Sequence, residues 1–145
     1  MAVELGSVDH LTQVISQVVA PSFLLGAVAS FASVLFMRMT NILERLRKLR
    51  SLPESGHDHS FLRADVPRLQ WRAQLVNAAI FLTVCSGAIA ALLIILAFAS
   101  AYMGLQHVWI AAVLFMISLT LLAGALVTFA IEVLSALREY DQHHP

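Results

Sequence analysis

Long apolar stretches separated by short polar segments dominate this chain of 145 residues. Three of the stretches, at about 22–40, 75–99 and 108–134, carry almost no charged side chain. Each approaches or exceeds the roughly 20 residues that an α-helix needs to cross about 30 Å of hydrocarbon. The pattern therefore predicts an all-α integral membrane protein with three transmembrane helices, which form a single membrane domain over residues 1–145.

A shorter segment at 8–20 predicts an amphipathic helix that lies at the membrane interface. Its apolar residues recur at helical spacing and its polar residues fall on the other face: Leu11, Val14, Ile15, Val18 and Val19 against Thr12, Gln13, Ser16 and Gln17. Pro21 predicts a break or bend after this helix, because proline lacks an amide donor and clashes with the preceding turn. A simple continuation of the next helix is the alternative.

The segments between the spans predict a helical hairpin at one end and a short connection at the other. The apolar stripe of the first span continues among basic residues, which predicts a helix over 22–50 that extends beyond the membrane. Residues 51–64 include Pro53 and Gly56 and predict a turn. A returning helix then leads into the second span over 65–99. A short connection at 100–107 precedes the third helix, at 108–137.

Charge gives the predicted helices an orientation. Only 12% of the residues are charged and 59% are hydrophobic, whereas about 25% of an ordinary soluble domain is charged. Eight of the nine Lys and Arg residues lie between Arg38 and Arg72. Because basic segments that flank spans stay in the cytoplasm, we expect the hairpin and the C-terminus to be cytoplasmic and the N-terminus to lie outside an inner (plasma) membrane.

The first span carries a stripe of small or polar residues at steps of three and four positions. We call it the α-stripe, and its members are Ser22, Gly26, Ser30, Ser33, Met37, Thr40 and Glu44. Small residues let helices approach closely, so packing is one interpretation. The other is the wall of a water-filled ion path at an oligomer axis. Because three helices alone form a thin bundle, we expect a symmetric homo-oligomer with this span at or near the axis.

Glu132 is the acidic residue that lies inside a span. Counted back from Arg138, it falls near the cytoplasmic side of the membrane, at a depth similar to that of Arg38. Ionisable groups inside membranes pair with one another or mark function. An ion pair between Arg38 and Glu132 is therefore the first expectation, and a proton or cation site is the alternative.

Other candidate sites are weaker. His57, Asp58 and His59 have metal-ligand side chains, but they fall in the predicted turn without further ligands nearby, so a solvated loop is expected and no metal site is predicted. The chain shows no catalytic constellation, so we expect neither an enzyme nor a cofactor. The basic residues flank spans and lack interleaved aromatic residues, which argues against nucleic-acid binding.

Several pieces of the chain resemble a known bacterial family. They are Pro21-Ser-Phe-Leu-Leu, the run Arg38-Met-Thr-Asn-Ile-Leu-Glu-Arg-Leu-Arg-Lys-Leu, the segment Leu69 to Arg72, and Phe129-Ala-Ile-Glu-Val. Together they resemble the family catalogued as domain of unknown function 2721, with Glu44 where an Asp would be expected. The resemblance covers roughly Leu11 to Leu137. It implies a small bacterial membrane protein with three spans, and it brings no established activity and no site residues.

Two functions fit this sequence. The first is a homo-oligomeric ion channel of the bacterial inner membrane, with the α-stripe lining the path for inorganic ions. The alternative is a structural or accessory membrane subunit that docks a partner or anionic lipid through its basic hairpin. The partners expected in either case are the lipid bilayer and further copies of the chain.

Overall fold

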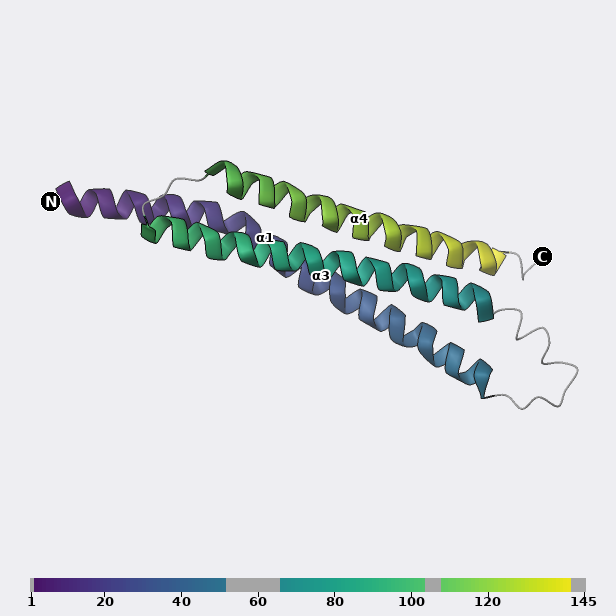
Figure 1. The fold of residues 1–145 in the computed structure, drawn as a ribbon. Coiled ribbons are helices and arrows are strands. Elements are labelled where there is room, and N and C mark those ends of the chain that lie inside the picture. Colours follow the sequence, from purple (N-terminus) through teal and green to yellow (C-terminus); the bar gives the residue numbers. More distant parts are fainter. Residues whose placement is uncertain (1, 52–65, 104–107, 142–145) are drawn as a thin grey trace, which may run out of the picture. The chain divides into compact units, whose positions relative to one another are not determined.

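The structure, a computed structural model, describes residues 2–51, 66–103 and 108–141 and consists of helices over nearly all of them (Figure 1). The helices are α1 (Ala2–Arg50), α3 (Val66–Met103) and α4 (Val108–Asp141). Among the described residues, three segments are long and apolar enough to cross a membrane: Ile15–Arg50, Val66–Met103 and Trp109–Arg138. The three predicted spans are thereby confirmed, and the chain is a multi-pass membrane protein.

The structure differs from the sequence-based expectation at Pro21. Of the break or bend expected there, the break does not occur: α1 is one helix that continues through Pro21, as the alternative of a simple continuation predicted, and residues 8–20 belong to it. Ending a helix leaves several carbonyl and amide groups without helical partners. A helix that continues through a proline loses only one backbone hydrogen bond. Inside a membrane, where no water can bond to unpaired backbone groups, this loss is smaller than that of ending the helix. A location of residues 8–20 at the membrane interface stays a prediction.

The other helix ends lie close to the predicted ones. Helix α3 continues to Met103, because helix-compatible residues extend past the expected end at residue 99. Helix α4 begins at Val108 and runs to Asp141. Most of the predicted turn at 51–64 and the end of the connection at 100–107 lie outside the described residues, and so do His57, Asp58 and His59.

The chain forms two compact units. Unit 1 comprises Met1–Phe31 and Thr83–Leu122, and unit 2 comprises Ala32–Leu82 and Ala123–Pro145. Each unit contains parts of α1, α3 and α4 and has its own apolar core.

Close packing between α1 and α3 characterises unit 1. Val18 is buried against Ala97, and further along the helices Leu24 and Val28 are buried with Ala90. A methyl group added at Gly87 of α3 would lie 3.0 Å from Cγ1 of Val28. A glycine is therefore what lets α3 approach this valine so closely.

A reciprocal pair of serines joins α3 to α4 in unit 1. Ser86 Oγ donates to the carbonyl oxygen of Ser118 at 2.8 Å, and Ser118 Oγ donates to the carbonyl oxygen of Ser86 at 2.8 Å. Both side chains are fully buried. Each hydroxyl group donates to a backbone oxygen of the neighbouring helix, so both hydroxyl groups have a hydrogen-bond acceptor inside the protein.

The core of unit 2 lies between the second half of α1 and the first half of α3. Ile42 and Leu46 of α1 are buried against Leu69 and Val76 of α3. Large apolar side chains on the outer faces of the helices, such as Phe36 and Phe81, are exposed. An exposed apolar surface of this kind is what contact with lipid tails requires.

Candidate functional site

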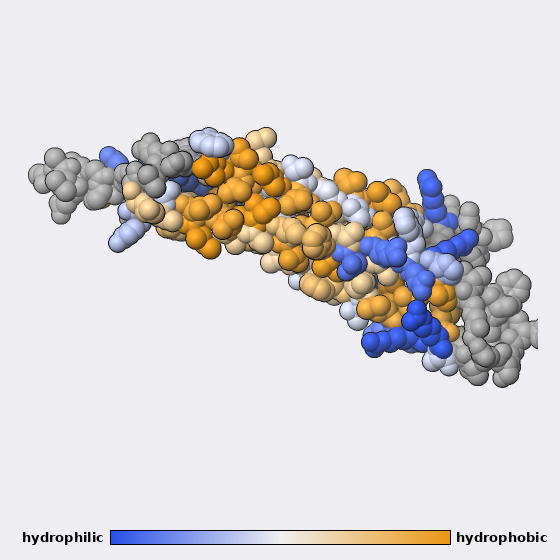
Figure 2. Space-filling model, in the orientation of Figure 1, coloured by the Kyte–Doolittle hydropathy of each residue, from blue (hydrophilic) through white to orange (hydrophobic). Residues whose placement is uncertain are grey.

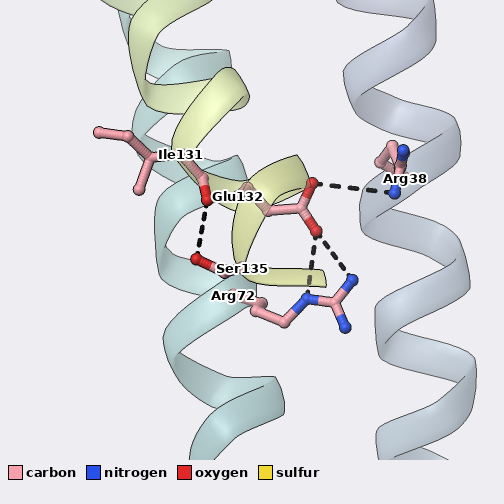
Figure 3. Close-up of polar contacts among 5 residues, drawn as sticks. All are labelled: Arg38, Arg72, Ile131, Glu132 and Ser135. Carbon is pink, nitrogen blue, oxygen red and sulfur yellow. Dashed lines mark hydrogen bonds and ion pairs between the residues drawn. The ribbon is translucent and has the colours of Figure 1, made fainter. Parts of the chain in front are cut away.

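Glu132 of α4 is completely buried in unit 2, where Arg72 of α3 holds it (Figure 3). Nε and Nη2 of Arg72 donate to the same carboxylate oxygen, Oε1, at 3.2 and 2.9 Å. The Arg72 side chain is only 13% exposed. A carboxylate buried without a cation would be strongly disfavoured, so this pair is what allows a charged residue inside α4.

Arg38 of α1 approaches the same carboxylate from another side (Figure 3). Its Nη1 lies 3.8 Å from Oε2 of Glu132, and its side chain is 39% exposed. The guanidinium also lies 5.7 Å from the centre of the Phe129 ring, within range of a cation–π contact. Oε2 is buried and makes no hydrogen bond within the described part of the chain. Arg38 therefore contributes a looser charge contact than Arg72 does.

The two arginines and Glu132 form a cluster, which we call the three-helix ion cluster, that connects α1, α3 and α4 of unit 2. Two guanidinium groups face one carboxylate, so the formal charge of the cluster is +1 when all three groups are ionised. The sequence pointed to Arg38 as the partner and missed Arg72. Arg72 flanks the second span at the same basic end as Arg38. Membrane depth therefore does not distinguish between the two arginines as partners of Glu132.

The α-stripe lies on the exposed side of α1. Ser22, Gly26, Ser30, Ser33, Met37, Thr40 and Glu44 are all exposed in the single chain. The buried residues Leu24, Val28, Leu35 and Ile42 are offset from stripe positions by two residues. Two residues correspond to about 200° around an α-helix. The stripe thus faces away from the side of α1 that packs in each unit.

Hydroxyl groups of the α-stripe bond to their own helix. Ser22 donates to the carbonyl of Val18 at 2.8 Å, Ser30 to that of Gly26 at 3.0 Å, and Thr40 to that of Phe36 at 3.0 Å. A hydroxyl that donates its proton inward still has two lone pairs that can accept a hydrogen bond or contact a cation. Both packing and an ion path are compatible with this arrangement.

An open groove beside the three-helix ion cluster is lined by four basic residues of unit 2. We call it the basic groove, and it has a volume of about 450 Å³. It is lined by Arg38, Asn41, Ile42, Glu44, Arg45 and Lys48 of α1 and by Leu69 and Arg72 of α3. Figure 2 shows hydrophilic side chains gathered over the C-terminal part of α1, next to a broad hydrophobic surface. Four cationic side chains against one carboxylate make this groove attractive to anions.

No cluster of His, Cys, Asp and Glu that could hold a metal ion occurs in the part of the chain that the structure describes.

Comparisons with known proteins give a family but no relative of known activity. Residues 18–142 match the family described as Protein of unknown function (DUF2721). Neither a curated protein nor a solved structure matches the chain.

Proposed function

We propose that this chain, which belongs to the family of unknown function DUF2721, is a homo-oligomeric membrane protein that conducts ions along the α-stripe of α1. The observation that supports this proposal best is the exposure of all seven stripe residues on a helix that is otherwise apolar enough to cross a membrane.

An exposed polar stripe within a span is poorly suited to contact with lipid tails. Hydroxyl groups gain little from hydrocarbon, whereas copies of α1 that face one another can cover the stripe. Around a symmetry axis, the same contact places hydroxyl oxygens of Ser22 and Ser30 toward a common centre. Their protons are already engaged with their own helix, so the oxygens present lone pairs to a passing cation.

A positive residue near a cation path would oppose conduction, but Arg38 lies toward α4 and not on the α-stripe. Its guanidinium lies near Glu132 and the Phe129 ring of α4, whereas the α-stripe lies on the exposed face of α1. Glu44 is the charged member of the stripe itself. The proposed path therefore contains a carboxylate near one mouth, and the arginine beside it is partly neutralised.

The proposed location is the bacterial inner membrane, with the N-terminus outside and the basic end of α1 in the cytoplasm. The support is the concentration of Lys and Arg between Arg38 and Arg72, because basic residues next to spans are retained on the cytoplasmic side.

Ion flux through the purified protein in liposomes tests the proposal. Potassium, sodium, chloride and protons are measured separately for the native protein, for Ser30→Leu and for Ala112→Leu. Ser30→Leu places a bulky apolar group on the stripe and is expected to lower flux at least ten-fold while the oligomer persists. Ala112→Leu adds the same bulk to an exposed position of α4 and is expected to leave flux within about two-fold.

Oligomer size is measured for all three proteins in the same detergent. A native protein that is monomeric in this measurement, or that conducts none of the four ions, contradicts the proposal. Loss of the oligomer in Ser30→Leu alone shows instead that the stripe serves packing.

A further inference from the structure

We infer that the basic groove binds the phosphate headgroup of an anionic phospholipid, and that Arg38 is shared between this headgroup and Glu132. The inference does not rest on ion conduction, because it uses the charges and contacts of unit 2.

The charges of the groove select an anion. Arg38, Arg45, Lys48 and Arg72 line it together with a single carboxylate, that of Glu44. Guanidinium groups bind phosphate oxygens through two parallel hydrogen bonds, and an ammonium group adds a compact positive charge. The groove is open and has a volume of about 450 Å³, so a headgroup can enter it.

The surroundings of the groove select a lipid over a soluble anion. Ile42 and Leu69 contribute apolar surface to its lining. Phe36 and Leu43 of α1 and Trp71 of α3 are exposed, so lipid-facing surface adjoins the basic residues. Basic pockets between helices at the edge of a membrane are suited to anionic headgroups, whose acyl chains then lie along the apolar surface.

Arg38 is the residue that can belong to both sites. Its Nη1 lies 3.8 Å from Oε2 of Glu132, beyond hydrogen-bond distance, and its side chain is 39% exposed. Arg72 by contrast makes two hydrogen bonds to Oε1. Glu132 therefore keeps a cation if the Arg38 guanidinium turns toward a phosphate, and the bound lipid would loosen the contact between α1 and α4 without leaving the buried carboxylate unpaired.

Two pairs of substitutions separate a defined groove from general attraction to a basic surface. Arg45→Gln with Lys48→Gln removes two positive charges that line the groove. Arg47→Gln with Arg50→Gln removes two from the same stretch of α1 at residues that are exposed and do not line it. Glu44→Gln removes the carboxylate of the groove and is expected to act in the opposite direction.

The experiment measures how much phosphatidylglycerol and phosphatidylcholine the full-length protein retains in neutral detergent, by mass spectrometry of the intact protein–lipid complex. The native protein is expected to retain phosphatidylglycerol preferentially. The Arg45/Lys48 pair should lower retention of phosphatidylglycerol by roughly 25-fold, since each of the two basic residues near an anionic headgroup contributes about a five-fold effect. The Arg47/Arg50 pair should lower it by less than about three-fold, and Glu44→Gln should raise it.

Three results would overturn the inference. Equal losses in the two pairs would show a diffuse basic surface, and equal retention of the two lipids would show that the headgroup charge is not recognised. Displacement of phosphatidylglycerol by an equal concentration of glycerol phosphate would show that the groove takes a soluble anion. Circular dichroism of each variant, with retention of helical signal required, excludes unfolding as the cause of a loss.

Discussion

Glu132 has two cationic neighbours that hold it with different strength. Arg72 donates two hydrogen bonds to Oε1 from a largely buried position, whereas Arg38 lies 3.8 Å from Oε2 and is more exposed. Solvent weakens the second contact, since exposed ion pairs contribute little to stability. The buried carboxylate thus depends chiefly on one arginine.

Removing the charge of Glu132 should destabilise the protein. Glu132→Gln removes the charge that accepts two hydrogen bonds from the largely buried Arg72, and we expect the free energy of unfolding to fall by about 3 kcal/mol or more. Glu44→Gln is the matched control, because Glu44 is exposed and surface changes usually stay within about 0.5 kcal/mol. Denaturant unfolding in detergent micelles, followed by circular dichroism, measures both. Equal stability of the two variants would refute the structural importance of the cluster.

The residue contacts illustrate what could and could not be predicted from the sequence. Glu132 stood out because an acidic residue inside an apolar run is conspicuous, and Arg38 because its depth matches. The choice of Arg72 as the closer partner depends on how α3 is rotated about its own axis, which no local pattern of residues determines. The Ser86–Ser118 pair was missed for the same reason, since serines are common in spans and only the relative register of α3 and α4 brings these two together.

At the scale of elements, the helices were predictable from the length of their apolar runs, and their junctions were less so. The three spans follow directly from hydrophobicity. The continuity of α1 through Pro21 could not be predicted in this way, because proline is a local signal for interruption. The opposing effect is the free-energy cost of unpaired backbone groups at a helix break, and that cost depends on the surrounding membrane.

Glycines at two helix contacts should respond differently to alanine. An added methyl group at Gly87 lies 3.0 Å from Cγ1 of Val28, whereas one at Gly124 lies 3.7 Å from Cδ1 of Leu82, an ordinary contact distance. Alanine favours a helix over glycine by about 1 kcal/mol, but overpacking costs about 1–3 kcal/mol. We expect Gly124→Ala to unfold at a higher denaturant concentration than Gly87→Ala.

A second change checks the cause of that difference. Val28→Ala removes the Cγ1 atom that an alanine at position 87 would meet. In this background the gap between Gly87→Ala and Gly124→Ala should shrink by about 1 kcal/mol or more, because contacting residues are energetically coupled. A gap that does not change would mean that Val28 is not the source of the strain.

At the scale of the whole molecule, the role proposed for the α-stripe depends on assembly rather than on folding. An added methyl group at Gly26 would meet nothing within 4 Å in the single chain. Gly26→Leu should therefore leave the stability of the helices within about 0.5 kcal/mol and still dissociate the proposed oligomer, which multi-angle light scattering of the detergent complex measures. An oligomer of unchanged size and stability in this variant would exclude close contact at Gly26.

The order of the three charged residues along the chain also bears on how the protein is made. Synthesis proceeds from the N-terminus, so Arg38 and Arg72 enter the membrane region before α4 and its Glu132 leave the translocon. An unpaired carboxylate opposes insertion of a span by about 2.5–3.5 kcal/mol at the centre of the span and by less near its end, where Glu132 is expected. Here the acidic residue emerges last, when both of its cationic partners already sit beside the lipid. The chain order therefore lets the final helix integrate with its counterions in place, and a circular permutation that puts α4 first would lose this advantage.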